Sequence, residues 1–192
     1  MSARGLLVSI AGTFALVSIA TAQTANLAEV MRAILLPNSN VIFAAQHEDF
    51  AAVTPDPDPS LATDPFKGVY SGWQAVDNAG IALVEATRLL TVPGRLCSNG
   101  KQVPVREAEF LKMVDDLRSA GLAASSAARS QNHERILDAA EKVSAACSRC
   151  HLRYREKGGE ENRCAAISPP GAPRAPAART SSRPAPRSAV RR

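Results

Sequence analysis

Two of the four cysteines stand three residues apart and are followed at once by a histidine. Cys147 and Cys150 enclose Ser148 and Arg149, and His151 comes next. On a helix, residues three apart lie on one side, so both thiols can meet the two vinyl groups of one porphyrin. His151 can then offer an imidazole nitrogen to the iron. The pattern C-x-x-C-H therefore predicts one covalently attached haem c, with His151 as the proximal iron ligand.

A zinc site, a redox-active thiol pair and a chance match are the alternatives for this pentapeptide. Structural zinc sites use four ligands, and the remaining candidates, Cys97, Cys164, His47 and His133, form no second paired motif. A thioredoxin-like thiol pair opens a helix after a strand, whereas this pair lies near the end of a helical segment. Both remaining histidines stand among polar residues, which favours solvent-exposed positions for them.

The apolar run near the start of the chain predicts a secretory signal peptide. Arg4 precedes the run over residues 5–20, and Ala20 and Ala22 match the small residues of a cleavage site before Gln23. We therefore expect residues 1–22 to be removed and the mature protein to lie in the periplasm without a stable membrane span. The alternative is an uncleaved anchor, because the run approaches the length that crosses a bilayer.

The elements that must position the motif are helices. Aromatic residues make up only 4% of the chain and alanine is abundant, which favours helices over strands. Apolar residues recur at spacings of three and four over residues 26–48, 67–90, 106–128 and 131–155. These segments predict an all-α, antiparallel four-helix bundle over residues 23–157. Pro37 predicts a kink or a break near Leu36, and Trp73 is expected in the core.

Residues 158–192 predict a disordered tail. They are rich in proline, alanine, serine and arginine and have no apolar periodicity. The six arginines after residue 165 exceed the net charge of +5 of the whole chain, so the remainder is mildly acidic. A basic tail on a mildly acidic body gives no indication of a nucleic-acid-binding domain.

With the motif at the end of its last predicted helix, the chain resembles the class II c-type cytochromes, the group of cytochrome c prime and its low-spin relatives. The resemblance covers roughly residues 26–155. Its most specific part is C-x-x-C-H-x-x-[FY]-[RK], which ends here in Tyr154 and Arg155. The resemblance implies an electron carrier, with haem between helices and unidentified redox partner proteins. The sequence shows no arrangement of a general base or a nucleophile, so we do not expect an enzyme. It leaves open the binding of nitric oxide or carbon monoxide by a five-coordinate iron, and also a homodimer.

The resemblance also names candidates on either side of the haem. Low-spin relatives place a methionine ligand in a pair like Met31 and Arg32, and a thioether ligand raises the reduction potential and closes the iron to gases. The alternative is a core methionine that fills space. Arg155 follows His151 by one helical turn. It is a candidate partner for a haem propionate, or it simply favours the C-terminus of the helix.

Cys97 and Cys164 remain once the motif cysteines are assigned to haem. An oxidising compartment favours their pairing. In an up-down-up-down bundle, the loop after the second helix lies at the same end as the C-terminus of the fourth, which brings the two cysteines together. We therefore predict a disulfide between them. The alternative is two unpaired thiols on flexible segments, where no geometry enforces the bond.

Overall fold

The computed structural model describes residues 25–54, 57–58, 70 and 72–165, and most of these residues are helical. This part of the chain contains no strand, only an isolated backbone bridge between Leu96 and Gln102. The all-α class is therefore confirmed. The predicted signal peptide lies outside the described residues, as does the predicted tail from residue 166 onwards. Among the described helices, none combines the length and the apolarity that crossing a bilayer requires.

The first helical segment runs without interruption through the site of the predicted break. It consists of α1 (Leu27–Val30), the π-helix η1 (Met31–Leu35), α2 (Leu36–Phe43) and the 3-10 helix η2 (Ala44–Gln46). Asn26 caps its start, because its side chain accepts the Glu29 N–H at 3.0 Å while the Glu29 carboxylate accepts the Asn26 N–H at 2.7 Å. These reciprocal bonds satisfy two backbone donors that the first turn leaves without a helical partner.

Pro37 is accommodated by a wide turn instead of a break. In η1 the N–H of Leu36 donates to the carbonyl of Met31, five residues earlier. A proline ring collides with the carbonyl of the preceding α-helical turn, and a π-helical turn makes room there. The prediction of an irregularity near Leu36 is confirmed in position, but the helix does not end there.

The other three long helices are α3 (Trp73–Leu90), α4 (Ala108–Arg129) and α5 (His133–His151), and α5 continues as the π-helix η4 (Leu152–Glu156). The predicted start of the second helix at residue 67 is wrong, because Tyr70 and Gly72 are not helical. Gly72, the residue before α3, has a φ of +58°. This positive φ favours glycine, and the helix begins directly after it.

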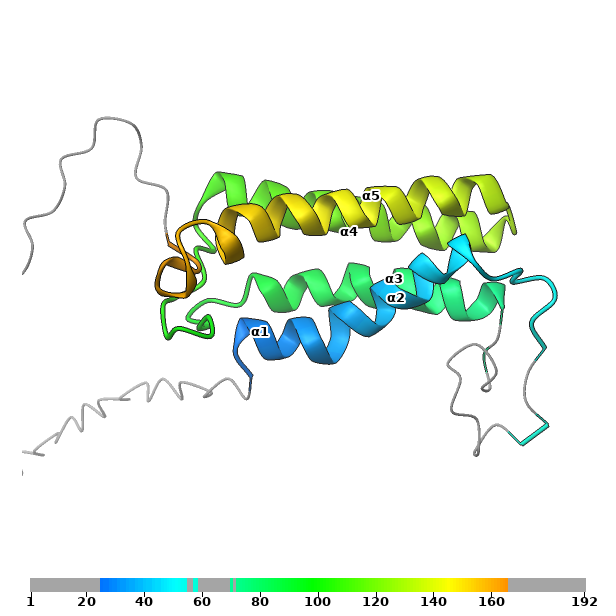
Figure 1. Cartoon of the computed structure of the whole chain (residues 1–192), viewed down its shortest axis with the longest axis horizontal. Helices are drawn as coiled ribbons and strands as arrows, with labels where there is room; N and C mark the ends of the chain where they lie inside the picture. Colours follow the sequence, from blue (N-terminus) through cyan, green and yellow to red (C-terminus); the bar gives the residue numbers. More distant parts are fainter. Residues whose placement is uncertain (1–24, 55–56, 59–69, 71, 166–192) are drawn as a thin grey trace, which may run out of the picture.

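The long helices lie side by side along the long axis of the molecule (Figure 1). Helix α3 contacts α4, α4 contacts α5, and α2 contacts both α3 and α5. At the crossing of α3 and α4 the backbones meet closely, because a Cβ on Gly80 would lie 2.7 Å from the Ser125 nitrogen and 2.9 Å from the Gly121 oxygen. Many of the residues that give the helical segments their apolar periodicity are buried, as follows: Val76, Gly80, Leu83, Leu90, Phe110, Val114, Leu117, Gly121, Ala124, Ile136, Ala140 and Val143. Trp73, expected in the core, is half-buried and packs against it.

The chain after α5 is folded as far as residue 165, where the sequence predicted disorder. The 3-10 helix η5 (Glu160–Asn162) follows the glycine pair, and Cys164 is buried. Cys164 forms a disulfide with Cys97, with their Cα atoms 6.5 Å apart, and its N–H donates to the Tyr154 carbonyl at 2.8 Å. The predicted disulfide is confirmed. The predicted start of the tail at residue 158 is wrong, because the covalent bond and these hydrogen bonds order residues 158–165.

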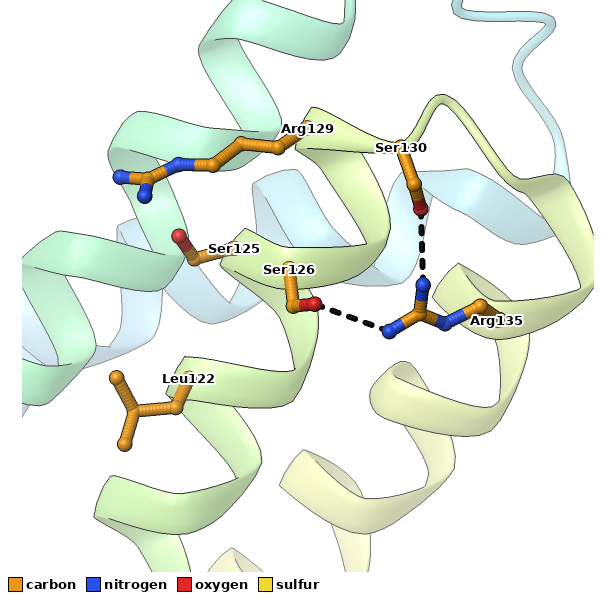
Figure 2. A pocket seen from close by; sticks show the side chains of 6 residues that line it. All are labelled: Leu122, Ser125, Ser126, Arg129, Ser130 and Arg135. Carbon is orange, nitrogen blue, oxygen red and sulfur yellow. Dashed lines mark hydrogen bonds between the residues drawn. The ribbon is translucent and has the colours of Figure 1, made fainter.

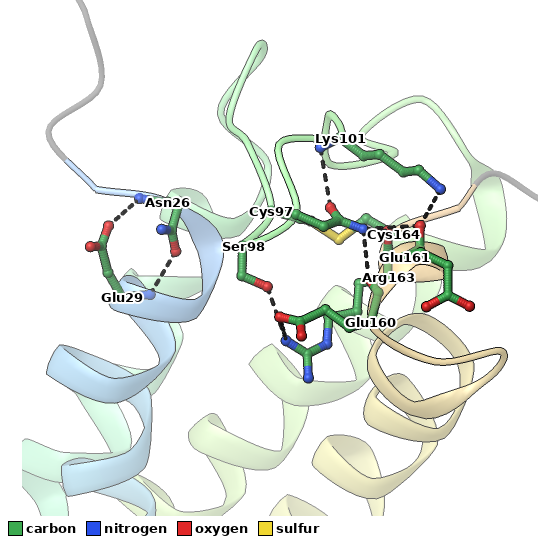
Figure 3. The surroundings of a disulfide bond; sticks show 10 residues. Asn26, Glu29, Cys97, Ser98, Lys101, Glu160, Glu161, Arg163 and Cys164 are labelled. Atoms are coloured by element: carbon green, nitrogen blue, oxygen red, sulfur yellow. Dashed lines mark hydrogen bonds and ion pairs between the residues drawn. A yellow bond between two sulfur atoms is a disulfide. The ribbon is translucent and has the colours of Figure 1, made fainter.

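The loop that carries Cys97 also binds this segment through side chains (Figure 3). The Asn99 amide donates to the carbonyls of Glu160 at 2.9 Å, Glu161 at 3.3 Å and Arg163 at 3.0 Å. The Lys101 ammonium donates to the Glu161 carbonyl as well. We call residues 91–107 and 154–165 together the stapled end of the molecule. It is the end at which α5 finishes (Figure 1).

Candidate functional site

The motif cysteines and His151 occupy the last turns of α5. Asn132 caps the start of this helix by accepting the Arg135 N–H at 2.9 Å, and the helical course continues past the motif into η4. Cys147 and Cys150 are both free thiols, half-buried and packed against the hydrophobic core. The motif is therefore presented as one face of a helix, with neither sulfur consumed by a disulfide.

Cys147 faces the first helical segment. The buried hydroxyl of Ser39, on α2, hydrogen-bonds the Cys147 sulfur, in keeping with the contact between α2 and α5. Burial raises the pKa of the Cys147 thiol, opposed in part by hydrogen bonds from its own backbone and from Ser39. Burial, with a smaller effect of Cys147, raises the pKa of Cys150 to about 11. Redox-active thiol pairs have lowered pKa values, so these two thiols do not resemble such a pair.

His151 is half-buried at the end of α5. Burial lowers its pKa, and the positive charge of Arg155 lowers it further, while Glu156 opposes the change. The imidazole is therefore held toward its neutral form. Neutral imidazole is the form that binds iron, because its free nitrogen lone pair is the ligand.

Tyr154 fixes the chain directly after the motif. Its ring is buried and meets the ring of Phe110 edge to face at 5.3 Å, while its hydroxyl donates to the Glu107 carboxylate at 3.0 Å. The Arg153 guanidinium lies over the same ring, 4.9 Å from its centroid. Because the Tyr154 carbonyl also accepts the Cys164 N–H, the end of α5 is held from α4 and from the stapled end together.

The remaining predicted site residues occupy separate positions. Met31 is half-buried in η1 and packs against the core, and η1 contacts α3, whereas α5 contacts α2 and η2. Arg155 is exposed and forms an ion pair with Glu156. The iron-ligand role of Met31 and the propionate role of Arg155 stay predictions. His47 and His133 are exposed, as the sequence predicted.

Two surface hollows are lined by residues other than Cys147, Cys150 and His151. One, of about 470 Å³, is at the turn between α4 and α5, where the Arg135 guanidinium donates to Ser126 at 2.9 Å and Ser130 at 3.1 Å (Figure 2). No cysteine, histidine or acid lines it. The other, of about 380 Å³, lies between α4 and α5 and includes Arg149, which pairs with Asp116 at 3.2 Å.

The donor set fits haem c. Two reduced thiols and a neutral imidazole lie on one helix, which is what two thioether bonds and one iron bond require. In the described ranges, no three histidine, cysteine, aspartate or glutamate side chains gather as a metal-ion cluster. Comparisons with protein-family models, with curated proteins and with solved structures found no match to this chain. The functional argument therefore depends on the motif and its surroundings.

Proposed function

We propose that this chain is a secreted, mono-haem c-type cytochrome of the class II kind that carries single electrons in the periplasm. The observation that supports the proposal is the pair of free, half-buried thiols at Cys147 and Cys150, next to the neutral imidazole of His151 on α5. The two cysteines would hold haem c through thioether bonds, and His151 would be the proximal ligand. The bound haem would supply the one-electron couple.

An antiparallel four-helix bundle is the arrangement we propose around that site. Helices α4 and α5 are joined by the short turn 130–132, which favours antiparallel neighbours. The contacts of α2 with α3 and α5, and of α4 with α3 and α5, support a closed ring of four helices. Helix α5 and the first helical segment would then lie on either side of the haem, with Ser39 and Cys147 where the two meet.

The chain's own residues would prepare the haem to transfer electrons rather than to bind gases. Met31, half-buried on the first helical segment, is the proposed sixth ligand. A thioether there would favour the reduced iron and occupy the position at which carbon monoxide binds. Without that ligand the iron would be five-coordinate, and the protein would bind nitric oxide or carbon monoxide instead.

The test of the central proposal is covalent haem in the protein secreted with its own leader. We expect one haem per chain that survives acid-acetone extraction and gives a c-type pyridine haemochrome. Cys147→Ser with Cys150→Ser should abolish it, whereas Ser148→Ala, the control at an exposed position of the same motif, should retain it. Extraction of all haem from the wild type would contradict the proposal.

The distal ligand is tested by carbon monoxide. Met31→Ala should convert a low-spin spectrum to a high-spin one and allow the reduced iron to bind carbon monoxide. Met113→Ala is the matched control, because Met113 is also half-buried and packs against the core from α4. If the wild type already binds carbon monoxide rapidly, the iron is five-coordinate and the gas-binding function replaces electron transfer.

A further inference from the structure

The stapled end contains a buried arginine without a negative partner. Arg95 is only 6% exposed. Its Nη1 donates to the backbone carbonyl of Ala25, and its Nε has no hydrogen-bond partner. Among the described residues, no carboxylate forms an ion pair with it. Burying a charge costs free energy unless the charge is paired. A negatively charged partner from outside the described chain would therefore stabilise the buried Arg95 guanidinium.

Arg163, at the same end of the molecule, is a second arginine with a buried Nε, and it differs from Arg95 in having a carboxylate partner. Its Nε is also buried without a partner. Its Nη1, however, donates to the Glu160 carboxylate at 2.9 Å and to the Ser98 hydroxyl at 3.1 Å. Arg163 therefore has a counter-ion from the chain. Arg95 has only one carbonyl, which carries no net charge.

Arg95 lies in the loop between α3 and α4, which is bonded to the start of the first helical segment and to the segment that follows α5. Its own carbonyl accepts the Val103 N–H at 2.8 Å, and the neighbouring Leu96 carbonyl accepts the N–H of Leu27, the first residue of α1, at 2.8 Å. Two residues further, Cys97 is bonded to Cys164, whose N–H donates to the Tyr154 carbonyl. Tyr154 follows His151 by less than one helical turn. Arg95 thus belongs to the end of the molecule toward which the motif runs.

We infer that Arg95 is the buried counter-ion of a haem propionate, an inference that rests on the proposed function. In haem, the two propionates are on the pyrrole rings opposite those that bear the vinyl groups. Cys147 and Cys150 both precede His151 along α5, so the vinyl edge would be held away from the stapled end and the propionate edge would face it. A guanidinium offers a planar set of donors that matches a carboxylate, and the unpartnered Nε of Arg95 is one of them.

Arg88, an exposed arginine on α3 with no part in the proposed site, provides the control. Its side chain is 81% exposed and pairs with Glu85 at 3.0 Å. Exposed ion pairs are screened by water and contribute little, whereas an ion pair formed in a buried site is screened much less. The two arginines are therefore expected to differ strongly in their effect on the haem.

The experiment measures the reduction potential of the haem-loaded full chain by spectroelectrochemistry. Arg95→Gln should lower the potential, because a nearby positive charge favours the reduced iron, and Arg95→Lys should restore part of the shift. Arg88→Gln should leave the potential close to that of the wild type. An unchanged potential in Arg95→Gln, or an equal shift in Arg88→Gln, would overturn the inference.

Resonance Raman spectra give a readout that a purely structural role of Arg95 would not change. The propionate bending bands respond to hydrogen bonds at the carboxylate, so they should shift in Arg95→Gln and Arg95→Lys. If Arg95→Gln fails to accumulate, Arg95→Lys still decides the question through these bands, and unshifted bands would overturn the inference. If the haem is covalent but the bands and the potential are unchanged in the Arg95 variants, only the inference about Arg95 is refuted. If the wild-type chain carries no covalent haem, the proposed function itself is refuted.

Discussion

The two ends of the molecule are held together by different means. At the stapled end, segments more than sixty residues apart are joined by the Cys97–Cys164 disulfide and by the side chain of Asn99. We call the opposite end, residues 44–53, 72–73 and 129–133, the turn end. Most backbone hydrogen bonds there are local, such as that from the Ala52 N–H to the Asp49 carbonyl at 3.0 Å. Its long-range contacts are between side chains: Phe50 packs edge to face on Trp73, with centroids 5.2 Å apart, and Arg129 pairs with Asp77 on α3 at 3.0 Å.

This difference shows which part of the helix framework must be rigid for the proposed chemistry. The motif lies in the half of α5 that approaches the stapled end, and the Tyr154 carbonyl is bonded directly to the stapled segment. A cofactor held at three points of one helix needs the end of that helix to be fixed, because a small rotation would move the sulfurs and the imidazole together. The motif lies outside the turn end, which is held by side-chain packing and by the exposed ion pair of Arg129 with Asp77.

Removing the disulfide should have the largest effect. Its two cysteines are 67 residues apart, and the chain-entropy model gives a loss of about 4 kcal/mol in the free energy of unfolding for Cys97→Ser with Cys164→Ser. Urea unfolding at neutral pH measures the loss, and reductant added to the wild type should reproduce it. A loss below about 1 kcal/mol would show that side chains such as Asn99 hold the stapled end without the covalent bond.

Truncating Phe50 tests the turn end in the same way. Phe50 is 2% exposed, and its replacement by alanine should cost about 3 kcal/mol through lost burial and an unfilled cavity. Tyr70→Ala is the control, because Tyr70 is 53% exposed and its loss should change the free energy of unfolding by less than about 0.5 kcal/mol. Equal effects in the two variants would mean that the turn end does not depend on its aromatic pair.

Some features of the fold could be predicted from the sequence and others could not. The buried positions of the long helices, such as Leu117 and Gly121, follow from apolar periodicity, and the disulfide of the stapled end follows from elimination and topology. Phe50 lies in a stretch without periodicity, so nothing local signals that it packs on Trp73. The burial of Arg95 likewise depends on the fold of the loop around it, which hydrophobic patterning does not describe.

Asn99 should show a smaller effect at the stapled end. Asn99→Ala removes three donor contacts to the carbonyls of residues 160, 161 and 163. These carbonyls lie near the surface and can bind water instead, so we expect a loss of only about 1 kcal/mol. Gln102→Ala, exposed in the same loop, is the control and should be neutral. Limited proteolysis after Gly159 should accelerate in Asn99→Ala alone, and similar rates in both variants would contradict a role for this amide.

Tyr154→Phe should have an effect at neutral pH similar to that of Asn99→Ala and a distinctive effect in alkali. It removes the hydrogen bond to Glu107, which is worth about 1 kcal/mol in a partly buried site. Burial, followed by the Glu107 carboxylate, raises the pKa of Tyr154 above that of an ordinary tyrosine. The folded state therefore retains the phenol proton in a pH range where the unfolded chain, with a pKa of about 10, has lost it.

The sign of the pH dependence follows from that raised pKa. The contribution of Tyr154 to stability is fully present below about pH 10 and is lost as the pH rises through the folded-state pKa. Urea unfolding between pH 8 and pH 11 should therefore show a steeper alkaline loss in the wild type than in Tyr154→Phe. Tyr70→Phe, at an exposed position, should follow the wild type. Parallel curves for the wild type and Tyr154→Phe would mean that the Tyr154 hydroxyl does not hold the end of α5 against α4, and the stapled end would then depend on its backbone contacts and disulfide alone.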